Sequence, residues 1–143
     1  MATTYVEMTQ GTPTSQRKFT YSGWIKKCED SPSAHQHIFS AGATSDSYYN
    51  GFRFLTGDAF HINMDSTGSS TWSLTTTRLF RDTTAWYHIV VAIDTTQAVA
   101  ADRMKLYING VQETSFSQTD YPTLNWDFGF MVSGDKIALG RQI

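Results

Sequence analysis

The chain has 143 residues, a formal net charge of −2 and a single cysteine, Cys28. Its length suits one domain with a sizeable core, residues 1–143, and the lone cysteine excludes an internal disulfide or a cysteine-rich zinc site. The eleven lysines and arginines are scattered and no apolar run approaches the roughly 18 residues of a membrane span, so we expect a soluble protein that binds neither nucleic acid nor membrane.

Composition and periodicity both indicate β structure. Aromatic residues make up 14% of the chain and charged residues only 17%, while long helix-forming stretches are missing. The first clear strand covers residues 18–27, where Phe19 and Tyr21 alternate with Thr20 and Trp24. Both faces of this strand carry an aromatic side chain, so Trp24 either lines a concave surface or lies under a loop.

Short strands follow in the first half of the chain, separated by turn residues. We expect them at 37–42, 52–55, 59–64 and 72–80. The turn Gly57-Asp58 joins two of them into a hairpin. In 72–80 the alternation slips out of phase before Leu79, which predicts a bulge or a bend.

The strongest strand signal is at 85–94, which is apolar on both faces and therefore typical of a central strand. Strands at 103–110 and 111–116 are joined by Asn109-Gly110, the dipeptide favoured in type I′ hairpins, and the last strand is expected at 136–140. About nine short strands at these spacings predict an all-β fold, a two-sheet antiparallel sandwich of the lectin-type jelly-roll kind.

Three stretches resemble a known family when taken together. They are 19–26, 86–94 and 105–111, which carry the patterns Trp-x-Lys, Trp-Tyr-His and Leu-Tyr-x-Asn-Gly. They look like the laminin-G-like branch of the concanavalin A-like lectin/glucanase superfamily. Residues 81–97 closely resemble lectin-like domains of tailed-bacteriophage structural proteins. This likeness implies a non-enzymatic virion component: a capsid decoration, a fibre or an appendage.

The chain departs from this family at its end. Related domains continue past the Leu-Gly-Arg strand into a further strand, whereas this sequence stops at Ile143. Either the sequence is a fragment that lacks its last strand, or another chain completes the sheet edge by strand addition. The expected partners are therefore other virion proteins, or a second copy of the chain bound through a sheet edge.

Enzymatic activity is not expected. Glucanases of the superfamily place paired carboxylates about 5 Å apart on one strand, as in Glu-x-Asp-x-x-Glu. The only glutamates are Glu7, Glu29 and Glu113, and none has a carboxylate two residues away. His88 fits a hydrogen-bonded structural histidine better than a catalytic base. His35 and His37 have the spacing of a metal pair but lack a third ligand nearby, so solvated loop histidines are the simpler interpretation.

Two segments offer aromatic rings beside amide or carboxylate groups, the combination that sugar binding needs. The candidate residues are Asp46, Tyr48, Tyr49, Asn50, Trp126 and Asp127. The same residues would serve equally well at a protein contact, so a carbohydrate-binding adhesin for host surface glycans is the alternative function.

We expect no cofactor, with calcium as the one ion left open. Loop carboxylates could hold it, namely Asp46, Asp58, Asp65 and Asp127, but solubilising turn residues explain them as well.

Overall fold

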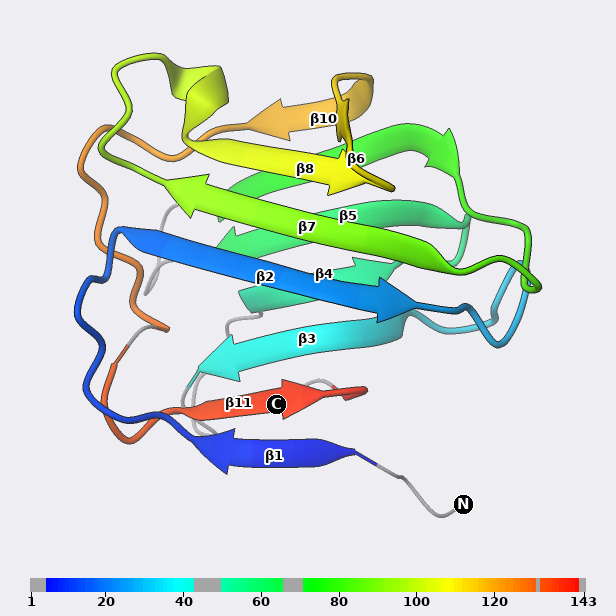
Figure 1. The fold of residues 1–143 in the computed structure, drawn as a ribbon, viewed down its shortest axis with the longest axis horizontal. Helices are drawn as coiled ribbons and strands as arrows, with labels where there is room; N and C mark the ends of the chain where they lie inside the picture. Colours follow the sequence, from blue (N-terminus) through cyan, green and yellow to red (C-terminus); the bar gives the residue numbers. More distant parts are fainter. Residues whose placement is uncertain (1–4, 43–49, 66–70, 131, 142–143) are drawn as a thin grey trace.

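The computed structural model describes residues 5–42, 50–65, 71–130 and 132–141, which form two antiparallel sheets packed face to face (Figure 1). The larger sheet has seven strands, in the order β1 (Val6–Thr9), β11 (Lys136–Leu139), β3 (Gln36–Gly42), β4 (Asn50–Phe54), β5 (Ala59–Asp65), β6 (Thr71–Leu79) and β10 (Phe116–Asp120). The smaller sheet has four, in the order β2 (Lys18–Ile25), β7 (Tyr87–Asp94), β8 (Met104–Ile108) and β9 (Val111–Glu113). This confirms the predicted all-β sandwich.

The described chain contains one short helical turn, a 3-10 helix at Ala100–Asp102. None of its helical segments has the length and apolarity needed to cross a membrane.

The core lies between the two sheets and is rich in phenylalanine. Phe39 and Phe52, on neighbouring strands of the larger sheet, stack with ring centroids 5.0 Å apart. Phe19 from β2 packs against both rings from the opposite sheet. Strand alternation sends every second side chain of β2 and β7 inward, so Ile89 and Val91 are also buried. Burial of these apolar side chains drives the packing of the two sheets.

Local signals in the sequence identify several turns and irregularities correctly. Asn109 and Gly110 both have positive φ, 52° and 81°, as a type I′ turn requires. The predicted bulge in β6 is present, because the β5 pairing shifts from Leu79 to Thr75 between Ala59 and His61.

One expected strand, 111–116, is divided. β9 ends at Glu113 and β10 begins at Phe116, in the other sheet. The Glu113 carboxylate accepts hydrogen bonds from the backbone N–H groups of Thr114 and Ser115, at 3.2 and 3.1 Å. These bonds hold the backbone in the bend that carries the chain from one sheet to the other.

The larger sheet extends beyond the smaller one on one side. In Figure 1, β3 lies beside β2, while β11 and β1 have no strand of the smaller sheet in front of them. β11 is not an edge strand, because β1 pairs with it from Val6↔Leu139 to Thr9↔Lys136. The edge strand beside this overhang is β2, which pairs only with β7 among the described residues.

Candidate functional site

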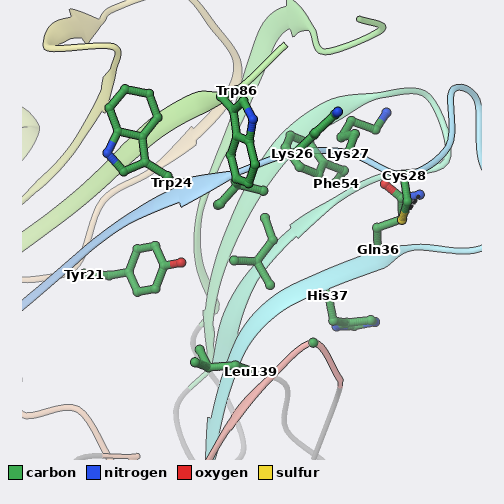
Figure 2. A pocket seen from close by; sticks show the side chains of 13 residues that line it. Tyr21, Trp24, Lys26, Lys27, Cys28, Gln36, His37, Phe54, Trp86 and Leu139 are labelled. Atoms are coloured by element: carbon green, nitrogen blue, oxygen red, sulfur yellow. Dashed lines mark hydrogen bonds between the residues drawn. The ribbon is translucent and has the colours of Figure 1, made fainter. Parts of the chain in front are cut away.

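A hollow of about 400 Å³ opens between β2 and the neighbouring strands β3 and β11 of the larger sheet. Figure 2 shows Trp24 and Trp86 at its upper rim, with His37 and Leu139 on the opposite wall. The hollow exists because the smaller sheet ends at β2 while the larger sheet continues. The topology therefore places this site where one sheet has no neighbour above it.

The two tryptophans of the rim point away from the core. Trp24 alternates with the inward-facing Tyr21 and Ile25, and Trp86 directly precedes β7. Their exposed fractions are 66% and 59%, which is high for the largest apolar side chain. Aromatic rings exposed together at the mouth of a hollow are typical of a binding surface.

His88 supports the Trp24 ring from the neighbouring strand. The two residues are directly opposite in the β2–β7 ladder, and their ring centroids lie 5.0 Å apart. A hydrogen bond of 3.0 Å between the imidazole Nε2 and the Ser22 hydroxyl orients His88. His88 is thus a hydrogen-bonded residue of the sheet, as predicted, and it holds one side of the exposed indole.

The inner end of the hollow is closed by a buried ion pair. The Lys27 ammonium donates to the Asp58 carboxylate at 2.5 Å and to the Phe80 carbonyl oxygen at 2.8 Å. It also lies 5.2 Å from the centre of the Phe54 ring. Burial opposes ionisation of Asp58, but hydrogen bonds from Lys27 and Ser31 outweigh it and hold the Asp58 pKa below its usual value.

The opposite wall combines polar and apolar groups. Gln36 and His37 come from the start of β3, and Leu139 comes from β11. Burial, with added repulsion from Arg53 and His35, lowers the pKa of His37 from 6.5 to about 4. His37 is therefore neutral at pH 7. It lies in β3, in agreement with the strand expected at 37–42, so the interpretation of solvated loop histidines fits only the exposed His35.

The hollow offers surfaces for contact more than groups for catalysis. Burial raises the pKa of Tyr21, so its hydroxyl remains protonated at neutral pH. Within the described ranges, no cluster of three His, Cys, Asp or Glu side chains could hold a metal ion. Cys28 is exposed, and Gln36 approaches its sulfur at 3.9 Å. Such a lining suits an apolar or aromatic ligand group.

Those predicted site residues that the structure describes do not line the hollow. Asp46, Tyr48 and Tyr49 fall outside the described residues. Asn50 begins β4, is only 6% exposed and shares the inward face with Phe52, so it is no surface ligand.

Trp126 and Asp127 are engaged within the protein. The Trp126 ring packs edge-to-face on Trp72 at 5.7 Å. Asp127 accepts two hydrogen bonds from Arg17, at 2.7 and 3.1 Å, and this pairing lowers the Asp127 pKa. Of the other carboxylates considered for calcium, Asp58 is paired with Lys27, whereas Asp46 and the Asp65 side chain are not described.

Sequence reasoning missed the hollow itself. The aromatic residues on both faces of the strand at 18–27 draw attention to Trp24, but the sequence leaves open whether its ring is covered. The outward direction of Trp86 could have been predicted from the sequence. Trp86 lies two residues before the outward-facing His88, in a strand whose alternate residues are core side chains, so the two side chains point to the same face.

Similarity to known proteins supports the same fold. A family model described as the concanavalin A-like lectin/glucanases superfamily matches residues 1–141. Among solved structures, the native heptameric SAP-like pentraxin from Limulus polyphemus is similar, with a TM-score of 0.59 and 17% identity. The match covers 97% of this chain and 58% of that chain, so this chain spans less than two thirds of the pentraxin. No curated protein sequence matches. At this identity the pentraxin likeness establishes the fold alone.

Proposed function

This chain belongs to the concanavalin A-like lectin/glucanase superfamily. We propose that it is a non-enzymatic structural protein of a bacteriophage particle. It would serve as a capsid decoration, fibre or appendage component, located in the virion. Its contact with a neighbouring virion protein, or with a second copy of itself, would run through the surface around Trp24 and Trp86.

The observation that carries this proposal is the pair of exposed indoles at the rim of the hollow. Tryptophan is among the residues that contribute most to protein interfaces, because it buries a large rigid surface on binding. Here two such rings, 66% and 59% exposed, flank an apolar depression. Exposed apolar surface of this kind usually marks a site that a partner covers.

Support for a phage particle comes from the sequence. Residues 81–97, which include Trp86 and all of β7, are the stretch whose sequence resembles tailed-phage structural proteins. The same stretch supplies one indole of the rim and His88, which supports the other. The resemblance and the candidate contact surface therefore coincide in one segment of the chain.

Support for a non-enzymatic role comes from the carboxylates. Asp58 is neutralised by Lys27 and Asp127 by Arg17, so neither is free to act as a nucleophile or general acid. Glycoside hydrolysis needs two carboxyl groups about 5 Å apart in a retaining enzyme. No lining residue of the hollow is an aspartate or glutamate.

The test is incorporation into particles of the phage that encodes the chain. We expect the chain in purified particles by mass spectrometry, at a fixed copy number. The double variant Trp24→Ala, Trp86→Ala should be lost from them, while Leu124→Ala, which removes another exposed apolar side chain, should be retained. Absence of the wild-type chain from purified particles would refute the virion role.

Binding of a host surface glycan is the second candidate, and one observation favours it. The His88 ring packs beside the Trp24 ring at 5.0 Å, and the exposed part of that indole offers a surface to an apolar sugar face. The competing location predicted from the sequence is the segment with Trp126 and Asp127, since Asn50 is buried.

A glycan array separates the two functions and the two locations. A saccharide signal that Trp24→Ala removes assigns the site to the sheet face, whereas one that Asp127→Asn removes assigns it to the segment around Trp126. Repeating the array with a chelator tests calcium, since calcium-dependent binding is lost when the ion is removed. A purely structural protein gives no saccharide signal.

A further inference from the structure

The free edge of β2 presents unpaired backbone groups. β2 is eight residues long and pairs over its whole length with β7 on one side. On its other side no described residue forms a backbone hydrogen bond with residues 18–25. In an antiparallel ladder, alternate N–H and C=O groups point to each side, so half of those of β2 face outward from the sheet. A row of this kind is a template for another strand.

Beside this edge lies an uncovered apolar strip on the larger sheet. It consists of Val6 and Met8 from β1 and Ile137 and Leu139 from β11. The register pairs Leu139 with Phe39 and Ile137 with Ala41, so the strip continues the core-facing side of the larger sheet. Val6, Met8 and Leu139 are nevertheless 65%, 58% and 43% exposed, because no strand of the smaller sheet lies over them.

We propose that an extended segment of another polypeptide adds to the free edge of β2, extends the four-stranded sheet by one strand and covers this strip. The hydrogen bonds would come from the β2 edge and the apolar contact from Val6, Met8, Ile137 and Leu139. The same segment would close the side of the hollow formed by Leu139. This inference is independent of the virion role, because it concerns the form of the partner and not its source.

β11 and β1, which extend beyond β2, leave room for a single strand beside β2 but not for a second whole copy of the chain. A second sandwich joined edge to edge at β2 would bring its own larger sheet into the space that β11 and β1 occupy (Figure 1). A single extended segment has no second layer and avoids that collision. Stacked sheets lie about 10 Å apart, and the side chains between the added strand and the larger sheet would fill that distance.

The charge of β2 defines the chemistry of the segment. The outward-facing side of β2 begins with Lys18 and is followed beyond the strand by Lys26, and β2 itself contains no carboxylate. Lys18 is paired with the Asp94 carboxylate at 3.2 Å, whereas Lys26 is exposed and forms no ion pair with a described residue, so Lys26 supplies the available charge. Opposite charges on neighbouring strands stabilise a ladder and like charges weaken it. The partner segment therefore alternates apolar residues, facing the strip, with acidic or hydroxyl residues on its outer face.

The other sheet edges are poorer templates. β1 and β9 are four and three residues long, and four of the five residues of β10 are exposed polar ones. Short and polar edges are those that proteins leave open safely. β2 combines the greatest length of the four edges with an adjacent apolar strip.

The test uses three synthetic peptides with the purified full chain. The first has the sequence Thr-Val-Glu-Val-Thr-Val-Glu-Val-Thr, and the other two are N-methylated at its odd-numbered or its even-numbered residues. Because a bound strand turns only one set of N–H groups toward β2, we expect one methylated peptide to bind about tenfold or more weakly and the other to retain affinity. Equal binding of both methylated peptides, or no binding of the first at about 1 mM, would overturn the proposal.

A matched pair of protein variants locates the peptide. Leu139→Lys places a charge in the strip and should weaken binding of the first peptide about tenfold, whereas Leu124→Lys, at a comparably exposed leucine outside it, should leave binding unchanged. Circular dichroism confirms that both variants fold. Hydrogen exchange gives a readout without mutation, since bound peptide should slow exchange at the β2 edge amides. An equal effect of the two variants, or unchanged β2 exchange, would place the peptide elsewhere.

Discussion

The ammonium of Lys27 and the carboxylate of Asp58 form an ion pair across 31 residues of sequence, with side chains 0% and 1% exposed. Lys27 follows the end of β2, and Asp58 lies in the turn before β5. The pair therefore ties the edge strand of the smaller sheet to the centre of the larger one. Asp58 has a φ of 67°, a conformation that aspartate and asparagine tolerate better than other non-glycine residues.

Removing one partner of this pair should be costly. Lys27→Met leaves the buried Asp58 carboxylate with only the exposed Arg81 guanidinium, 3.5 Å away, as a counter-ion, and we expect unfolding in urea to show a loss of about 3 kcal/mol. The neighbouring Lys26→Met, at an exposed position, should change stability by less than about 0.5 kcal/mol. The double variant Lys27→Met, Asp58→Asn should recover part of the loss, because the amide carries no charge. Similar losses for Lys27→Met and Lys26→Met would contradict this account.

Stability should decrease as the pH falls from about 6.5 toward 4, and the part of this decrease above about pH 5 precedes the titration of most carboxylates. The folded-state pKa of His37 is about 4, below its usual 6.5, so in this range the unfolded chain binds a proton that the folded chain does not. Urea unfolding at several pH values measures the slope. His37→Gln should make it shallower, and His35→Gln should have a smaller effect because His35 is the more exposed of the two. A slope that His37→Gln leaves unchanged would assign it to other groups.

Substitution of Gly51 should disrupt the pairing of β3 with β4. A Cβ atom added there would lie 2.0 Å from the Phe39 carbonyl oxygen, where the β3–β4 register shifts between His37 and Phe39. We expect Gly51→Ala to destabilise the fold by about 3 kcal/mol, because the obstacle is backbone and cannot rotate away. Gly57→Ala is the control, since nothing lies within 4 Å of its added Cβ. The two thermal unfolding midpoints should differ accordingly, and equal midpoints would mean that β3 can shift.

Arg103 should matter more to stability than its place near the surface suggests. Its guanidinium donates to the carbonyl oxygens of Gln97, Ala98 and Pro122, at 2.8, 2.8 and 2.9 Å. Arg103→Ala should cost about 1.5 kcal/mol, and Arg103→Lys should recover little, because an ammonium cannot satisfy three acceptors in a fork. Arg17→Ala, which removes an exposed ion pair with Asp127, should cost less. Full recovery in Arg103→Lys would show that charge alone is sufficient.

Local sequence patterns were sufficient to predict most strands and turns. Alternation in 18–27 identifies β2 and its inward residues, and Asn109-Gly110 identifies a hairpin, since both depend on backbone geometry over a few residues. β1 was not predicted, because the alternation of Val6 and Met8 with Glu7 and Thr9 covers only four residues, too few to identify a strand.

The candidate site depended on contacts between distant segments. The pattern of its strand is compatible with either a covered or an exposed Trp24 ring. The ring is exposed because the sheet order places β2 at the edge. Trp126 and Asp127 looked available in the sequence, yet Trp72 and Arg17 engage them. Alternation is fixed by the chain's own geometry, whereas edge position and burial depend on which strands pair. That pairing depends on hydrogen bonds and packing between residues far apart in sequence, and so only the tertiary structure decided it.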